Sequence, residues 1–119
     1  MRRREVLGLA VLAILALAAA QAVLAADKAC DPNYDNFGKA FVAKYCLGCH
    51  TSAKTGKDRM GAPKKTNFDA PADIKKAKAD IVKMTIAKPA MPPMDPKPTD
   101  DEKAKLKAWL DCEYSQSGN

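Results

Sequence analysis

The sequence predicts an all-α domain of three helices, on the strength of three observations. Apolar residues recur at helical spacing in three separate segments of the chain. The stretches between these segments are rich in glycine, proline and lysine and show no periodicity. No convincing strand run is present. A repeat of three to four residues is typical of a helix that buries one face.

The first predicted helix covers residues 36–46, where Phe37, Phe41 and Tyr45 recur every four residues on one face. Residues 51–67 mix Gly, Pro, Lys and Thr and are expected to form a loop. The second predicted helix covers residues 71–87, because a proline suits its first turn and an apolar face follows. That face consists of Ile74, Ala77, Ile81 and Met84.

The third predicted helix follows a stretch that excludes regular structure. Residues 88–98 contain five prolines, which neither a helix nor a central strand tolerates. Thr99 then precedes three acidic residues, an arrangement that predicts a capping box at the start of a helix. Leu106, Trp109 and Leu110 form the apolar stripe of that helix.

Residues 1–25 are predicted to be a signal peptide. Three arginines near the start precede 21 uncharged residues, 6–26, with small residues at their end. Cleavage after Ala25 would leave residues 26–119 as one small domain. The uncharged stretch is also long enough to span a bilayer, so an uncleaved membrane anchor is the alternative.

The charge of residues 26–119 argues against a nucleic-acid partner. This segment contains 17 Lys and Arg residues and 13 Asp and Glu residues, and 16 of the 17 basic residues are lysines. Recognition of bases and phosphates usually relies on arginine, and aromatic residues are not interleaved with these charges. The lysines are interpreted either as a solvated surface or as a docking face for acidic partners.

Cys46-Leu47-Gly48-Cys49-His50 carries the strongest chemical signal. A Cys-X-X-Cys-His run is the attachment motif of a c-type haem, in which both thiols bind the porphyrin and the histidine is the proximal iron ligand. A thioredoxin-like redox pair would need strands around the motif. A zinc site would need further ligands with paired spacing, which Cys30 and Cys112 lack. The prediction is therefore one haem c, held by Cys46, Cys49 and His50.

The second iron ligand has to be sought among the methionines, because His50 is the only histidine. Met84 lies on the apolar face of a predicted helix and is interpreted as a core residue. Met60 lies among charged residues in a loop. Met91 and Met94 remain, both in the proline-rich loop, whose restricted backbone can hold a weak thioether ligand.

These features together resemble the class I bacterial c-type cytochromes. The resemblance is carried by residues 46–50 after an aromatic helix, by Pro89-Ala90-Met91-Pro92-Pro93, and by a C-terminal helix with Trp109. It implies a small three-helix cytochrome c fold wrapped around one haem. It also implies that Met91, which opens the Met-Pro-Pro stretch, is the distal ligand rather than Met94.

The resemblance implies two further contacts. Gly38 matches a small position where the first and last helices cross, with Trp109 packing against it. The loop Gly61-Ala62-Pro63 resembles the one whose carbonyl accepts the other ring proton of the proximal histidine, here His50.

Cys30 and Cys112 remain as a pair in an exported chain, which favours an intramolecular disulfide. The crossing of the first and last helices could bring these ends together. Closing a loop of about 80 residues could stabilise the domain by roughly 4–5 kcal/mol in the chain-entropy model. A free buried thiol and an intermolecular link are the alternatives.

The predicted function is that of a periplasmic one-electron carrier, not an enzyme, because both axial positions are filled and no nucleophile with a base is evident. Its expected partners are redox proteins that dock transiently, with a lysine-bearing face as the candidate docking surface, and a membrane only if residues 1–25 are uncleaved. The alternative is a haem-based ligand sensor, or a small haem subunit of a redox enzyme, with a labile distal ligand. A structural zinc protein is a third interpretation.

Overall fold

The computed structural model describes residues 29–115, and within this range the chain forms helices joined by loops and no strand. The predicted all-α fold class is confirmed. The predicted signal peptide, residues 1–25, lies outside the described residues. Among residues 29–115, none of the helices combines the length and the apolar character that crossing a membrane requires.

The first helix begins earlier than predicted. It consists of a π-helical turn, η1 (Tyr34–Gly38), that continues into α2 (Lys39–Tyr45). Asn33 caps it, because its side chain accepts a hydrogen bond from the Asn36 backbone N–H at 3.0 Å. The Asn36 side chain in turn accepts from the Asn33 N–H at 2.8 Å. This reciprocal pair is a capping box with Asn in place of the usual Glu or Gln, and it moves the helix start to Tyr34.

The prediction of a single helix over residues 71–87 is wrong in one respect, because the segment has three parts. They are α3 (Pro71–Lys76), α4 (Lys78–Ile81) and the π-helical η3 (Val82–Ala87). The break lies at Ala77, whose φ and ψ are −93° and 5°. Its N–H is shared between the carbonyls of Asp73 and Ile74, at 3.1 Å each, which tightens the turn before the helix resumes.

The last helix confirms its predicted start. α5 (Asp100–Glu113) is capped by Thr99, whose hydroxyl accepts from the Glu102 N–H at 3.2 Å. The Glu102 carboxylate accepts from the Thr99 N–H at 2.9 Å, which completes the capping box. Leu106, Trp109 and Leu110 are almost completely buried, as the stripe predicts.

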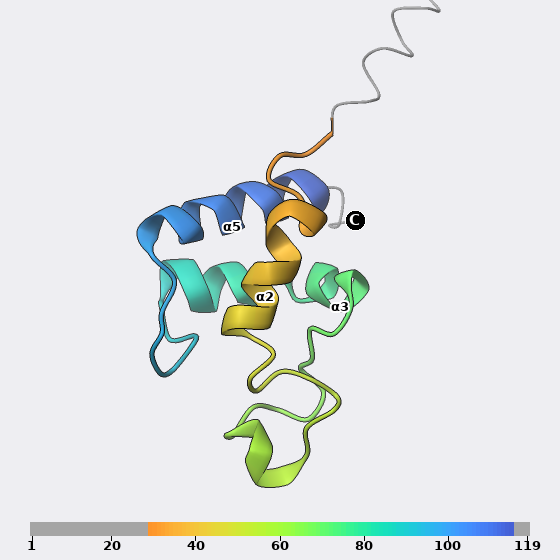
Figure 1. The fold of residues 1–119 in the computed structure, drawn as a ribbon, viewed down its shortest axis with the longest axis vertical. Helices are drawn as coiled ribbons and strands as arrows, with labels where there is room; N and C mark the ends of the chain where they lie inside the picture. Colours follow the sequence, from red (N-terminus) through yellow and green to blue (C-terminus); the bar gives the residue numbers. More distant parts are fainter. Residues whose placement is uncertain (1–28, 116–119) are drawn as a thin grey trace, which may run out of the picture.

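The crossing of η1 and α5 forms one end of the core (Figure 1). Gly38 lies directly against the indole of Trp109, as the family resemblance implies. Glu113 fixes the crossing, because it accepts from the Trp109 Nε1–H at 2.7 Å and from the Tyr34 N–H at 2.8 Å. The rest of the core packs around this crossing and consists of Phe41, Val42, Phe68, Ile74, Ile81, Leu106, Leu110 and Tyr114.

Cys30 and Cys112 are paired at the same end of the molecule. Their Cα atoms are 5.8 Å apart across a sequence separation of 82 residues, which is ordinary disulfide geometry. The pairing is the predicted one, and non-reducing peptide mapping tests whether the bond forms in the isolated protein.

The segment 51–67 leaves the helices and forms a separate lobe, drawn in green in Figure 1. It was expected to be an irregular loop, and it contains one short 3-10 helix, η2 (Gly56–Arg59). Met60 and Gly61 end this helix with positive φ angles of 52° and 87°. The lobe and the proline-rich loop each contribute residues to one cavity.

Candidate functional site

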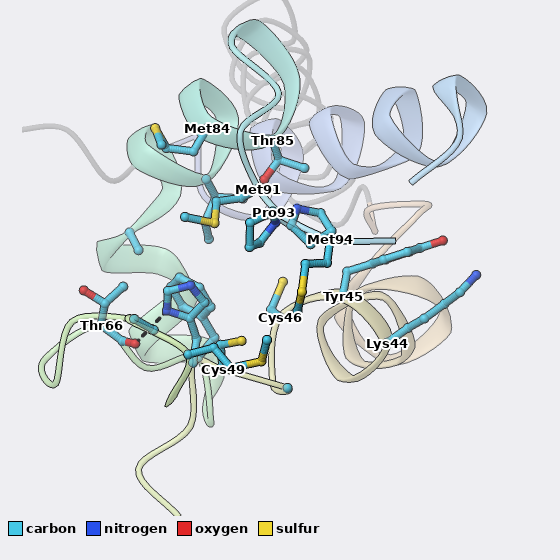
Figure 2. Close-up of a pocket in the computed structure, with 18 of the residues that line it drawn as sticks. Lys44, Tyr45, Cys46, Cys49, Thr66, Met84, Thr85, Met91, Pro93 and Met94 are labelled. Atoms are coloured by element: carbon cyan, nitrogen blue, oxygen red, sulfur yellow. Dashed lines mark hydrogen bonds between the residues drawn. The ribbon is translucent and has the colours of Figure 1, made fainter. Parts of the chain in front are cut away.

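A cavity of about 520 Å³ lies between α2, the 51–67 lobe, the α4–η3 segment and the proline-rich loop. Cys46, Cys49, His50 and Met91 all line it, so the structure brings together the four predicted site residues from two regions of the chain. In Figure 2 the side chains of Cys46, Cys49 and Met91 border a common space. Most of the other lining residues are apolar.

The two cysteines follow the end of α2 directly. The N–H of Cys46 still bonds to the Val42 carbonyl at 2.9 Å, and the N–H groups of Cys49 and His50 both bond to the Cys46 carbonyl, at 3.2 and 2.9 Å. This tight turn presents both thiols and the imidazole to one cavity. Burial raises the pKa of the Cys46 thiol to about 12, so this sulfur is a neutral thiol at physiological pH.

His50 is held in one orientation by three contacts. Its carbonyl accepts from the Phe68 N–H at 2.9 Å, and its ring packs on the Phe68 ring with centroids 4.9 Å apart. Its Nδ1 lies 3.0 Å from the Thr66 carbonyl oxygen, the dashed contact in Figure 2. Because a carbonyl can only accept, Nδ1 carries the ring proton. Nε2 therefore keeps its lone pair for a metal.

The expected partner of His50 is corrected by this contact. The carbonyl comes from Thr66 and not from the Gly61-Ala62-Pro63 segment. The Pro63 carbonyl is already occupied, because it accepts from Arg59 Nη2 at 2.7 Å and from the Thr66 N–H at 2.9 Å. The turn that these bonds close places Thr66, three residues further along, next to the imidazole.

Sequence reasoning missed Arg59, which lies in the expected loop and is only 4% exposed. Its guanidinium bonds to the carbonyls that shape the lobe, including that of Thr66 at 3.1 Å. One signal in the sequence could have found it. It is the only arginine among residues 26–119, in a segment with 16 lysines, and a fork of donors is what distinguishes arginine from lysine.

Four methionines line the cavity, and they differ in how they are held. Met94 and Met60 are 52% and 54% exposed. Met91 is half-buried, and its N–H bonds to the Met84 carbonyl at 2.9 Å, which ties the start of the proline-rich loop to η3. Met91 is thus the better fixed of the two candidates for the distal ligand.

A polar cluster joins the rim of the cavity to α5. The Tyr45 hydroxyl donates to the Glu102 carboxylate at 2.7 Å, and the Lys44 ammonium lies 3.4 Å from the same group. The pKa of Glu102 is lowered to about 2, first by the hydrogen bond from the Thr99 backbone and then by those from Tyr45 and Lys44. The carboxylate is therefore charged at any neutral or mildly acidic pH.

The donor set fits a haem better than a zinc ion. Two thiols at the motif spacing, an imidazole with a free Nε2 and thioethers surround an apolar cavity. Within residues 29–115, by contrast, no three His, Cys, Asp or Glu side chains are grouped as a metal site would need. The zinc interpretation therefore gains no support from the described part of the chain.

Comparison with known proteins agrees with this geometry. The family model described as "Cytochrome C oxidase, cbb3-type, subunit III" matches residues 35–110, which include the attachment motif, the cavity and most of α5. No curated protein and no solved structure gave a significant match. A cytochrome c domain implies haem-based electron transfer, and such domains are usually exported or associated with a membrane. The chain belongs to this family of c-type cytochrome domains.

Proposed function

We propose that this chain is a periplasmic mono-haem electron carrier, with the haem bound covalently through Cys46 and Cys49 and the iron held between His50 and Met91. The observation that carries the proposal is the convergence of these four side chains on one apolar cavity. When bound, the haem would supply one-electron chemistry through its ferrous and ferric states.

The residues around the cavity have distinct roles in this proposal. Cys46 and Cys49 would anchor the cofactor, and His50 would offer Nε2, because Nδ1 is engaged by Thr66. Met91 would offer its thioether from a loop fixed to η3. With His50 and Met91 both holding the iron, no position would be left for oxygen or a substrate, which is the property of a carrier rather than an enzyme.

Covalent attachment is tested by replacing both Cys46 and Cys49 with Ala in a host that attaches c-type haem. The wild-type mass should exceed that of the polypeptide by one haem, and the haem should stay with the chain after denaturation. The double variant should lose this denaturation-resistant signal. An unchanged covalent signal in the double variant would contradict the proposal.

The distal ligand is tested by comparing Met91→Ala with Met94→Ala. Met91→Ala should abolish the weak ferric band near ~695 nm that marks methionine ligation, lower the reduction potential and open the iron to cyanide or carbon monoxide. Met94→Ala, the matched control three residues away, should change neither spectrum nor potential. The reverse result would assign the ligand to Met94, and no effect of either change would favour a ligand sensor.

Export and docking complete the proposal. A domain starting near residue 26 would be released into the periplasm if the signal peptide is cleaved, and N-terminal sequencing of the isolated protein tests this. The excess of lysine supports transient docking on acidic surfaces of redox partners, although the cavity lining itself includes Asp80 and Asp95 as well as Lys44. Docking of this kind predicts that electron-transfer rates fall as the ionic strength rises.

The family description favours a second candidate, a haem subunit of a larger redox enzyme, because the matched model is named for an oxidase subunit. The two candidates differ in their assembly. A carrier should be isolated from mild native extracts as a free protein of about one domain, whereas a subunit should comigrate with larger haem-containing partners. Native electrophoresis with haem staining distinguishes them.

A further inference from the structure

Arg59 is a buried cation whose hydrogen-bond acceptors are all main-chain carbonyls. Its side chain comes from the last residue of η2 and turns into the 51–67 lobe rather than toward solvent. Its hydrogen bonds reach carbonyls near both ends of the lobe. This one side chain therefore holds more than a single turn in place. The accepting oxygens are those of Thr51 at 2.6 Å, Lys54 at 3.3 Å, Ala62 at 3.2 Å, Pro63 at 2.7 Å and Thr66 at 3.1 Å.

No carboxylate forms an ion pair with this guanidinium within the described part of the chain. Every ion pair found among residues 29–115 has a lysine as its cation. All direct contacts of the Arg59 charge are therefore with main-chain carbonyls. One carboxylate acts on it at longer range: hydrogen bonds from Thr51 and Ser52 lower the pKa of Asp69, and the charge of Arg59 lowers it further. An arginine remains protonated throughout the accessible pH range, so the charge is permanent.

The Thr66 carbonyl connects this charge to His50. Its oxygen accepts from His50 Nδ1 at 3.0 Å and from Arg59 Nη2 at 3.1 Å. A carbonyl that already accepts from a cation is a weaker acceptor for a second donor. The Nδ1–H bond of His50 is then less polarised, and the ring is less basic at Nε2 than with an unshared carbonyl.

Two effects of Arg59 act on the reduction potential in the same direction. A less basic imidazole stabilises a ferric centre less, and a nearby buried positive charge also disfavours the more positive oxidation state. We propose that Arg59 is a positioning residue that fixes the Thr66 carbonyl against His50 and, by sharing that oxygen, raises the reduction potential of the site. This inference rests on the proposed role of His50 as an iron ligand.

The test compares Arg59→Gln and Arg59→Lys with Lys57→Gln. Lys57 lies in the same short helix but is exposed, so its variant removes one positive charge without touching the carbonyls. The measurements are the midpoint potential of the haem-loaded protein and the NMR shift of the His50 Nδ1 proton in the ferrous state. The second measurement reports on the hydrogen bond itself and does not depend on electron transfer to a partner.

Arg59→Gln should lower the ferrous-to-ferric ratio at a fixed ambient potential by about three- to tenfold, where tenfold corresponds to 59 mV for one electron. It should also shift the Nδ1 proton. Arg59→Lys keeps the charge but not the fork of donors, so it should give a smaller change of the same sign. Lys57→Gln should change the ratio by less than about twofold.

The inference is overturned if Arg59→Gln binds haem with methionine ligation intact and shows the wild-type potential and Nδ1 shift. If Arg59→Gln does not bind haem, Arg59→Lys decides, and wild-type values in that variant overturn the inference equally. A failure of the proposed function is distinguishable from a failure of this inference. In the first case the wild-type protein itself would lack covalent haem or the methionine band.

Discussion

Replacing Gly38 with Ala tests the crossing of η1 and α5 most directly. Gly38 has helical φ and ψ angles of −59° and −46°, so alanine fits the backbone without strain. Judged by helix propensity alone, the change should stabilise the protein by about 1 kcal/mol. The structure predicts the opposite sign, because the new methyl group would meet the indole of Trp109.

The size of the effect follows from the contact distances. A Cβ built on Gly38 would lie 2.4, 2.6 and 2.6 Å from three atoms of the Trp109 ring. Carbon atoms in contact are about 3.5–4.0 Å apart, so the ring would have to move by about 1 Å. Trp109 is fully buried and its Nε1–H is bonded to Glu113, which leaves little freedom. Overpacking typically costs about 1–3 kcal/mol, and three contacts this short place the cost at the upper end, about 2–3 kcal/mol. Subtracting the propensity gain of about 1 kcal/mol leaves a net loss of about 1–2 kcal/mol.

The assay is urea unfolding of the haem-loaded protein, followed by circular dichroism. Ala43→Gly is the control, because this exposed position of α2 reports the difference in helix propensity between Ala and Gly without a change in packing. It should lower the unfolding free energy by about 1 kcal/mol. The double variant Gly38→Ala/Trp109→Phe removes part of the clashing ring, so it should be more stable than the sum of the single changes predicts. A Gly38→Ala protein as stable as the wild type would refute the reasoning.

Two more predictions concern the ends of the first and last helices. Replacing Cys30 and Cys112 together by Ser should lower the unfolding free energy by up to roughly 4–5 kcal/mol, because the bond closes a loop of more than 80 residues. Urea titrations measure this loss. Free alkylatable thiols at both positions in the native protein would contradict the pairing. Glu102 has a folded pKa of about 2 against an ordinary value of 4.5, so its contribution is complete above pH 4.5 and is lost as the pH falls toward 2. Glu102→Gln should therefore flatten the stability–pH profile in that window, and Tyr45→Phe, which removes one of its donors, should do so in part.

Local signals predicted the start of the last helix best. The Thr99 capping box and the buried stripe of α5 depend on residues a few positions apart, so their pattern is complete in the sequence. The same is true of the cysteine and histidine positions in the attachment motif, which one tight turn determines. The break at Ala77 could not be predicted in this way, because the apolar spacing continues through it. The break shows only in the hydrogen bonds of the backbone, where the Ala77 N–H is shared between two carbonyls.

The orientation of His50 depends on tertiary structure and was predicted less well. The family resemblance implied that a loop carbonyl would accept its ring proton, but the choice of Thr66 over Pro63 depends on where the Arg59 guanidinium lies. A charged residue in a polar loop is ordinarily exposed, and its burial becomes visible only when five carbonyls are seen to converge on it. The choice of Met91 over Met94 came from the family resemblance, and it remains a prediction.

The pairing of Cys30 with Cys112 has a consequence for protein engineering. Because the Cα atoms of the two residues are 5.8 Å apart, the chain enters and leaves the described domain at nearly the same point (Figure 1). A domain with adjacent ends can be inserted into a surface loop of a host protein, or circularly permuted, without stretching either connection. The residues that line the cavity, between 41 and 96, lie outside that junction, so such a fusion would leave the redox site of this small domain open to a partner.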